Sequence, residues 1–206
     1  MLGVICVPNS PRYVNPQQIS QVVGALPLDP HTGKFLCDRV GVFVNSSLDV
    51  IQTTVAIGRL SGVQLHGDES PEDCYKLKQQ LPTLKFIKAL RIKSAADLIQ
   101  AEHYQSCVDL LLLDAYHPTI AGGTGKTLDW QSLQSFQPSI PWLLAGGLNP
   151  ANITQALERV HPAGIDLSSG VEVAPGNKDL TKVNQLFTAL ANFGVSTQTA
   201  AGIERF

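Results

Sequence analysis

The sequence predicts an α/β fold in which strands of a parallel sheet alternate with helices. Two observations support this prediction. Seven apolar segments end at small or polar residues, as the strands of a buried parallel sheet do. A helix-start signal built from Ser, Asn or Asp follows each of these segments. Repeated alternation of this kind favours right-handed βα crossovers and a barrel of the (β/α)8 TIM type.

The seven expected strands are continuous apolar runs rather than alternating ones, which is typical of strands covered by helices on the sheet faces. They are Leu2–Val7, Arg39–Val44, Gly62–Leu65, Leu84–Ala89, Leu110–Leu113, Trp142–Ala145 and Gly164–Leu167. A closed barrel has eight βα units, so one unit is missing from this count. An open Rossmann or flavodoxin-like sheet needs fewer strands, but the first strand–helix junction, Pro8–Tyr13, lacks the G-x-G-x-x-G fingerprint of dinucleotide-binding sheets.

The helix starts are recognised by capping residues, in several cases with proline at the first helical position. They are Asn15-Pro16, Ser46-Ser47, Ser70-Pro71-Glu72-Asp73, Ser94, Asp129, Asn149-Pro150 and Asp179. Apolar residues recur at helical spacing in Gln17–Leu26 and Glu72–Leu81, which predicts helices with one face against the sheet.

Two strand ends near the carboxyl terminus resemble a phosphate cradle. Leu144–Gly147 is followed by Asn149-Pro150, and Asp166–Gly170 ends the last strand. Unpaired N–H groups at a helix start bind anions, and barrels frequently bind phosphate in the loops after their seventh and eighth strands. We therefore expect a phosphorylated substrate; the alternative is that the glycines only permit tight turns. The expected phosphate-binding residues are Gly146, Gly147, Ser168, Ser169 and Gly170.

Composition indicates one globular domain. The 206 residues are 44% hydrophobic and 16% charged, with a formal net charge of −2. We expect a single barrel domain over 1–194, lacking the first strand and helix, and a loose tail over 195–206. Scattered basic residues argue against a nucleic-acid partner. No apolar run reaches the roughly 20 residues of a membrane span and no signal peptide opens the chain, so we expect a cytoplasmic protein without a membrane partner.

The four cysteines and five histidines are dispersed and form no C-x-x-C pair. We expect reduced thiols and no metal site, because a zinc site needs clustered Cys and His. Gly122–Thr127 ends in Gly-Lys-Thr, but the first glycine of a nucleotide P-loop would fall at Ile120. We expect a glycine-rich active-site loop there instead; the alternative is a connector without ligand contact.

Taken together, the motifs resemble one family, phosphoribosylanthranilate isomerase, over nearly the whole chain. The matching segments are Ser10–Val14, Val40–Asn45, Val63–Glu69, Leu112–Asp114, Gly122–Trp130, Ala145–Pro150 and Asp166–Glu172.

The resemblance implies an aldose–ketose isomerase of tryptophan biosynthesis that needs no cofactor or metal. It converts N-(5-phosphoribosyl)anthranilate to 1-(2-carboxyphenylamino)-1-deoxyribulose 5-phosphate by an Amadori rearrangement. The chemistry needs a general acid at the furanose oxygen and a general base that removes the proton from C2′. By the resemblance, Asp114 is the general acid and Arg12 contacts the anthranilate portion. The same resemblance assigns the phosphate to the glycine and serine loops that spacing already indicates.

The resemblance also shows a departure. The first strand of family members ends in Lys-Ile-Cys-Gly, whose cysteine is the general base, and no segment here matches it. We expect a start codon placed too far downstream, with the missing βα unit encoded upstream. The alternative is a catalytically impaired, phosphosugar-binding remnant of the family. Cys6 aligns with the second family strand, and we interpret it as a packed core thiol rather than as the base.

Two other phosphosugar barrels fit poorly. A metal-dependent epimerase needs ligands that only His66 and Asp114 offer, and an indole-glycerol-phosphate synthase needs catalytic lysines where only Lys85 and Lys88 stand, within a strand. We leave His66 and Asp166 outside the catalytic set. The sequence does not distinguish a monomer from a homodimer.

Overall fold

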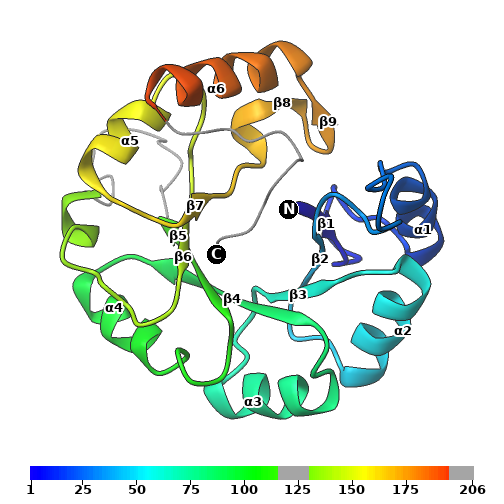
Figure 1. Cartoon of the computed structure of the whole chain (residues 1–206). Helices are drawn as coiled ribbons and strands as arrows, with labels where there is room; N and C mark the ends of the chain where they lie inside the picture. Colours follow the sequence, from blue (N-terminus) through cyan, green and yellow to red (C-terminus); the bar gives the residue numbers. More distant parts are fainter. Residues whose placement is uncertain (116–129, 195–206) are drawn as a thin grey trace. The chain divides into compact units, whose positions relative to one another are not determined.

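The computed structural model describes residues 1–115 and 130–194. The chain forms two compact units: the first holds residues 1–89 and 106–110, and the second holds the other described residues. In both, strands and helices alternate along the chain (Figure 1).

The first unit contains three strands and the first five residues of a fourth, which pair in parallel and in chain order. They are β1 (Leu2–Ile5), β2 (Arg39–Phe43), β3 (Gly62–Leu65) and β4 (Lys85–Ile92). The central strands bury nearly every side chain, which explains their unbroken apolar character. The four predicted strands are confirmed, with β4 extending three residues beyond the expected end.

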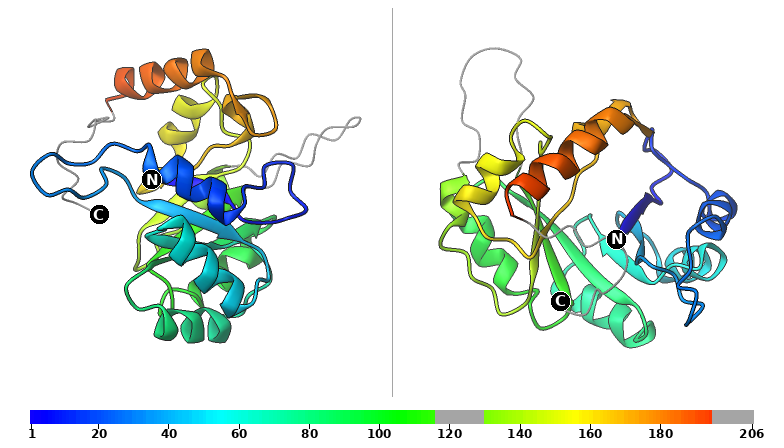
Figure 2. Two further views of the ribbon diagram at one scale, coloured as in Figure 1. Left: turned by 90° about the vertical axis from the view of Figure 1, so that its right-hand side faces the viewer. Right: turned by 45° about the horizontal axis from the view of Figure 1, so that its top comes forward.

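Three helices of the first unit begin at the predicted caps. They are α1 (Pro16–Gly24), α2 (Leu48–Gly58) and α3 (Pro71–Gln80), capped by Asn15, Ser47 and Ser70. The Asn15 and Ser70 caps are complete capping boxes followed by proline. Helices α1 and α2 lie side by side (Figures 1 and 2). Helix α1 buries Ile19 and Val23, as its apolar spacing predicts.

The second unit contains α4 (Ala95–Glu102), capped by Ser94 as predicted, and three parallel strands in chain order. These strands are β5 (Leu110–Ala115), β6 (Trp142–Ala145) and β7 (Gly164–Ile165), with a 3-10 turn, η1 (Trp130–Leu133), before β6. Two helices follow β6 and β7: α5 (Ile153–Arg159) and α6 (Leu180–Asn192), which lie side by side in both figures. Asp179 caps α6 as predicted, since its side chain accepts from Thr181 and Lys182 N–H.

The predicted start of α5 at Asn149-Pro150 falls on the turn that leads into the helix, since the Asn149 carbonyl accepts from Ile153 N–H at 3.1 Å. The regular helix begins at Ile153, with Asn152 at the cap position. Asn149 caps only the preceding turn, through a 2.9 Å bond from Ala151 N–H to its side chain. The side chain of Asn152 turns back and accepts from Asn149 N–H at 2.8 Å, so both asparagines cap backbone N–H groups of this turn.

The end of β7 also differs from the prediction. The strand stops at Ile165, two residues early, and a 3-10 turn, η2 (Ser169–Val171), follows. An antiparallel hairpin, β8 (Glu172–Ala174) and β9 (Asn177–Lys178), then precedes α6. The sequence analysis did not predict this hairpin.

Several predicted features lie outside the described residues: the Asp129 helix start, the Gly122–Thr127 loop and the 195–206 tail. Within the described part of the chain, no helix has the length and apolar character that crossing a bilayer requires. The same residues contain no group of three side chains suited to hold a metal ion.

Three of the four thiols are buried, namely Cys6, Cys74 and Cys107, and Cys37 is half-buried. Burial raises the pKa of Cys6 to about 11 and that of Cys74 to about 12, from an ordinary 9.0. At pH 8 the Cys6 thiolate is therefore rarer than in an unfolded chain.

We expect an aromatic disulfide reagent at pH 8 to label Cys37 first and the other three only after denaturation. Mass spectrometry of the labelled peptides identifies the order. Rapid labelling of Cys6 in the folded protein would contradict its position in the core.

Candidate active site

Asp114 lies at the carboxyl end of β5, the end at which parallel barrels place their catalytic groups. Its side chain is half-buried. In the sheet register Asp114 stands opposite Ala145, the last residue of β6. The carboxyl group and the glycine loop after β6 therefore lie at adjacent strand ends. The sequence analysis expects the general acid at the first of these ends and part of the phosphate site at the second.

Gly146 and Gly147 form the turn that leaves β6. Their φ angles of 91° and 64° lie in the left-handed region, which explains why both are glycine. The carbonyl of Gly147 accepts from the side-chain amides of Asn149, at 3.3 Å, and Asn152, at 3.0 Å. These amides fix the loop.

The second predicted phosphate loop, Ser168–Gly170, packs directly against the first. A Cβ atom placed on Gly170 would meet the carbonyl oxygen of Leu148 at 1.8 Å. The backbones of the two loops therefore touch, and the structure brings together the loops that the sequence analysis paired.

Ser168 is held by charged groups that the sequence analysis missed. Lys178 Nζ donates to the carbonyl of Ser168 at 3.1 Å and pairs with the buried carboxylate of Glu172 at 3.0 Å. Lys182 Nζ donates to the carbonyl of Glu172 at 2.9 Å. The sequence gives little indication of these contacts, because the charged residues between Glu172 and Lys182 follow no periodic pattern.

An open cavity of about 590 Å³ lies beside the second loop. Ser169, Gly170 and Lys182 border it together with the Asn149–Ala151 turn and Gln185. Gly146, Gly147 and Ser168 are not among its lining residues. The predicted phosphate set thus divides into two residues that face this cavity and three that shape the adjoining backbone.

Arg12 belongs to the first unit and stands in the turn between β1 and α1, at the carboxyl side of the sheet. It is half-buried, and its N–H donates to the side chain of Ser10 at 3.2 Å. The turn is closed by further backbone bonds, from Tyr13 N–H to Ser10 and from Val14 N–H to Ile5. This geometry holds Arg12 at a defined place beside the strand end.

The residues left outside the catalytic set also lie at strand ends. His66 follows β3, and its Nδ1 is 3.2 Å from the side-chain amide of Gln64. Asp166 follows β7 and donates its N–H to Leu144. Cys6 is buried next to β1 and its sulfur is 3.6 Å from the carbonyl of Val4, which confirms a packed thiol.

Comparison with known proteins decides the family. Residues 1–189 match the family described as N-(5'phosphoribosyl)anthranilate (PRA) isomerase. The chain belongs to the N-(5'-phosphoribosyl)anthranilate isomerase family. Its relatives of that name include those of Synechococcus elongatus, 56% identical over 92% of this chain and 85% of the relative, and of Acaryochloris marina, 57% identical over 90% and 85%.

Solved PRA isomerases share the fold. The enzyme of Thermotoga maritima superimposes with a TM-score of 0.78 at 33% identity, covering 92% of this chain and 87% of that one. A second PRA isomerase structure, with a TM-score of 0.75 at 30% identity over 92% and 86%, contains reduced 1-(o-carboxyphenylamino)-1-deoxyribulose 5-phosphate. These matches confirm the predicted TIM-barrel class and the predicted activity, the isomerisation of PRA in tryptophan biosynthesis.

Proposed function

We propose that this isomerase uses Asp114 as the general acid of the Amadori rearrangement. Asp114 donates its proton to the furanose oxygen as the C1′–oxygen bond breaks, which leaves an open-chain iminium ion. Loss of the C2′ proton to a general base then gives an enolamine that becomes the aminoketose. The supporting observation is the register that places Asp114 opposite Ala145, directly before the Gly146-Gly147 turn.

The phosphate of the substrate is assigned to the two touching loops. Gly146 and Gly147 expose backbone at the end of β6, and Ser168–Gly170 supply N–H groups and two hydroxyls at η2. Lys178 holds the Ser168 carbonyl of the second loop and Lys182 holds the Glu172 carbonyl beyond it, which supports a loop whose N–H groups are fixed before the substrate arrives. We expect the protein to work in the cytoplasm on this small phosphorylated substrate.

Arg12 is assigned to the anthranilate carboxylate, which a planar guanidinium binds through two parallel hydrogen bonds. Cys6 does not supply the general base, because burial raises the pKa of its thiol and disfavours the thiolate.

Replacing Arg12 by alanine should raise the KM for the substrate about tenfold while kcat changes little, because a charge-assisted hydrogen bond is worth about 1.5–3 kcal/mol. The assay follows the loss of anthranilate fluorescence with freshly generated substrate. Arg12→Lys keeps the charge but not the paired geometry and should recover only part of the loss. An unchanged KM in Arg12→Ala would reject the proposed contact between Arg12 and the anthranilate carboxylate.

The same assay tests the proposed function of the natural full-length protein directly. Turnover of phosphoribosylanthranilate supports the isomerase. Binding of the phosphorylated compound without turnover would instead support the phosphosugar-binding remnant.

A further inference from the structure

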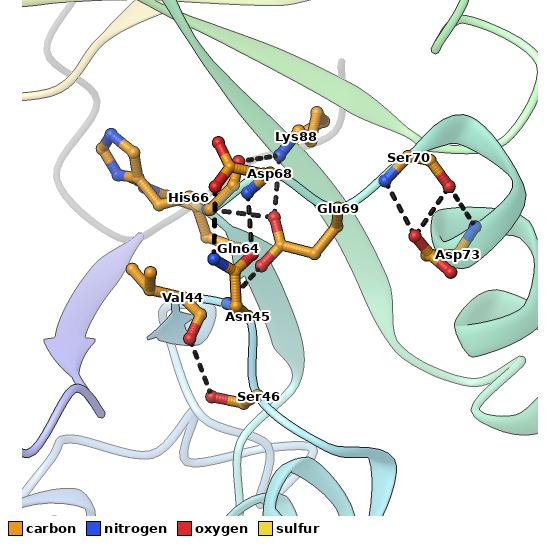
Figure 3. Close-up of polar contacts among 11 residues, drawn as sticks. Val44, Asn45, Ser46, Gln64, His66, Asp68, Glu69, Ser70, Asp73 and Lys88 are labelled. Carbon is orange, nitrogen blue, oxygen red and sulfur yellow. Dashed lines mark hydrogen bonds and ion pairs between the residues drawn. The ribbon is translucent and has the colours of Figure 1, made fainter.

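A buried ion pair lies among the apolar strands of the first unit. Lys88, on β4, is only 1% exposed, and its Nζ is 2.8 Å from Oε2 of Glu69, whose side chain is 7% exposed (Figure 3). The lysine interrupts an otherwise apolar strand. Burying two charges costs free energy that their attraction often fails to recover, and apolar residues of similar size are commonly as stable. Stability alone is therefore a weak explanation for this pair.

The pair is bonded to the backbone of the loop after β3. Glu69 Oε2 also accepts from Gly67 N–H at 2.9 Å, and Lys88 Nζ donates to the Gly67 carbonyl at 2.8 Å. Both polar groups of Gly67 are thus held by the same ion pair. The loop next to His66 cannot rotate without breaking a charge-assisted hydrogen bond.

Glu69 reaches the preceding loop as well. Its Oε1 accepts from Asn45 N–H at 2.8 Å, directly beyond β2. Asn45 has a φ of 48°, and its side-chain oxygen accepts from Asp68 N–H at 2.8 Å. Figure 3 shows Asn45, Asp68, Glu69 and Lys88 converging at this point. One carboxylate therefore ties together the ends of β2 and β3 and a side chain of β4.

These strand ends are the carboxyl ends, where barrels of this type bind their substrates. We propose that Glu69 and Lys88 are positioning residues of this isomerase, which hold the loop of His66, Gly67 and Asp68 in its substrate-binding conformation. They act through the backbone of Gly67 and not by touching the reacting atoms. The inference rests on the isomerase activity of the family and does not depend on the role assigned to Asp114.

The test is the double variant Glu69→Gln with Lys88→Met, in the natural full-length protein. It leaves no unpaired buried charge, but the carboxamide has one oxygen for two backbone N–H groups and the Gly67 carbonyl loses its lysine. We expect the KM to rise about tenfold with kcat changed less than about threefold, because the loop loses hydrogen bonds that hold its conformation while the reacting groups are untouched. The affinity for reduced 1-(o-carboxyphenylamino)-1-deoxyribulose 5-phosphate, measured by calorimetry, should fall by the same factor.

A matched control exists on the same strand. Lys85 opens β4 and pairs with Asp38 at 2.8 Å, at the amino end of the sheet. The double variant Lys85→Met with Asp38→Asn removes an ion pair of the same length without touching the loops after β2 and β3. We expect it to lower the melting temperature but to leave KM within about twofold of the natural value.

Asn45→Gly provides the second variant if the buried double variant does not fold. Glycine tolerates the positive φ of this position, so only the side-chain bonds to Asp68 are lost. We expect a KM increase of about fivefold with an unchanged kcat. A natural KM and natural ligand affinity, in the folded double variant or otherwise in Asn45→Gly, would overturn the proposal. Natural activity in Asp114→Asn would reject the proposed acid but would leave this result unaffected.

Discussion

Asp114→Asn should lower kcat by about 10²–10⁴, the usual contribution of a positioned general acid. Asparagine has nearly the same shape as aspartate but no acidic proton, so the furanose ring opens without assistance from this position. Because the loops to which we assign the phosphate are unchanged, KM should change little. The measurement is steady-state turnover of freshly generated phosphoribosylanthranilate by the natural full-length protein and by the variant.

Asp109 is the control for this prediction, since it lies next to the opposite end of the same strand. It pairs with Lys78 and accepts from Phe86 N–H at 2.8 Å. Asp109→Asn should therefore lower the melting temperature and preserve kcat. If Asp114→Asn turned over substrate at the natural rate, the role of Asp114 as the acid would be rejected, whatever its effect on stability.

Gly170→Ala should raise the KM by roughly ten- to hundredfold and reduce stability by about 1–3 kcal/mol. The new methyl group would stand 1.8 Å from the carbonyl oxygen of Leu148, and a backbone atom cannot move aside as a flexible side chain can. One of the two phosphate loops must shift. Inhibition by inorganic phosphate, compared between the variant and the natural protein, reports the loss at the phosphate site itself.

The matched control for the glycine is Gly3→Ala, because a Cβ atom on Gly3 meets nothing within 4 Å. This variant should bind substrate and phosphate as the natural protein does. A natural KM in Gly170→Ala, with an unchanged melting temperature, would show that the loops separate without cost and would contradict the close contact.

The elements most predictable from the sequence are those determined by local interactions. Helix starts at Asn15, Ser47 and Ser70 depend on side chains bonding N–H groups three residues ahead, so the sequence nearby is sufficient. The regular part of α5 starts later than Asn149-Pro150, after a turn in which the side chains of Asn149 and Asn152 accept from backbone N–H groups. The side chain of Asn152 donates to the Gly147 carbonyl and accepts from Asn149 N–H. These contacts depend on the conformation of the loop after β6.

The missed elements depend on distant contacts. Strands β8 and β9 are too short to show a hydrophobic period, and the pairing of Lys178 with Glu172 becomes visible only when the hairpin is formed. The sequence analysis did not predict the pairing of Lys88 with Glu69, because the conformation of the loop after β3 brings the two side chains together. Asp114, Arg12 and the phosphate residues rest on the family resemblance and on strand-end position, and their roles stay predictions.

The contacts of Glu69 also bear on how the first unit folds. Its carboxylate is neutralised and fully hydrogen-bonded only when β2, β3 and β4 are all in place, since its donors come from Asn45, Gly67 and Lys88. A partial assembly that buried Glu69 without β4 would separate its carboxylate from Lys88 and bury an uncompensated charge, which is unfavourable by several kcal/mol. A half-formed sheet of this kind is disfavoured, which couples the formation of β3 to that of β4.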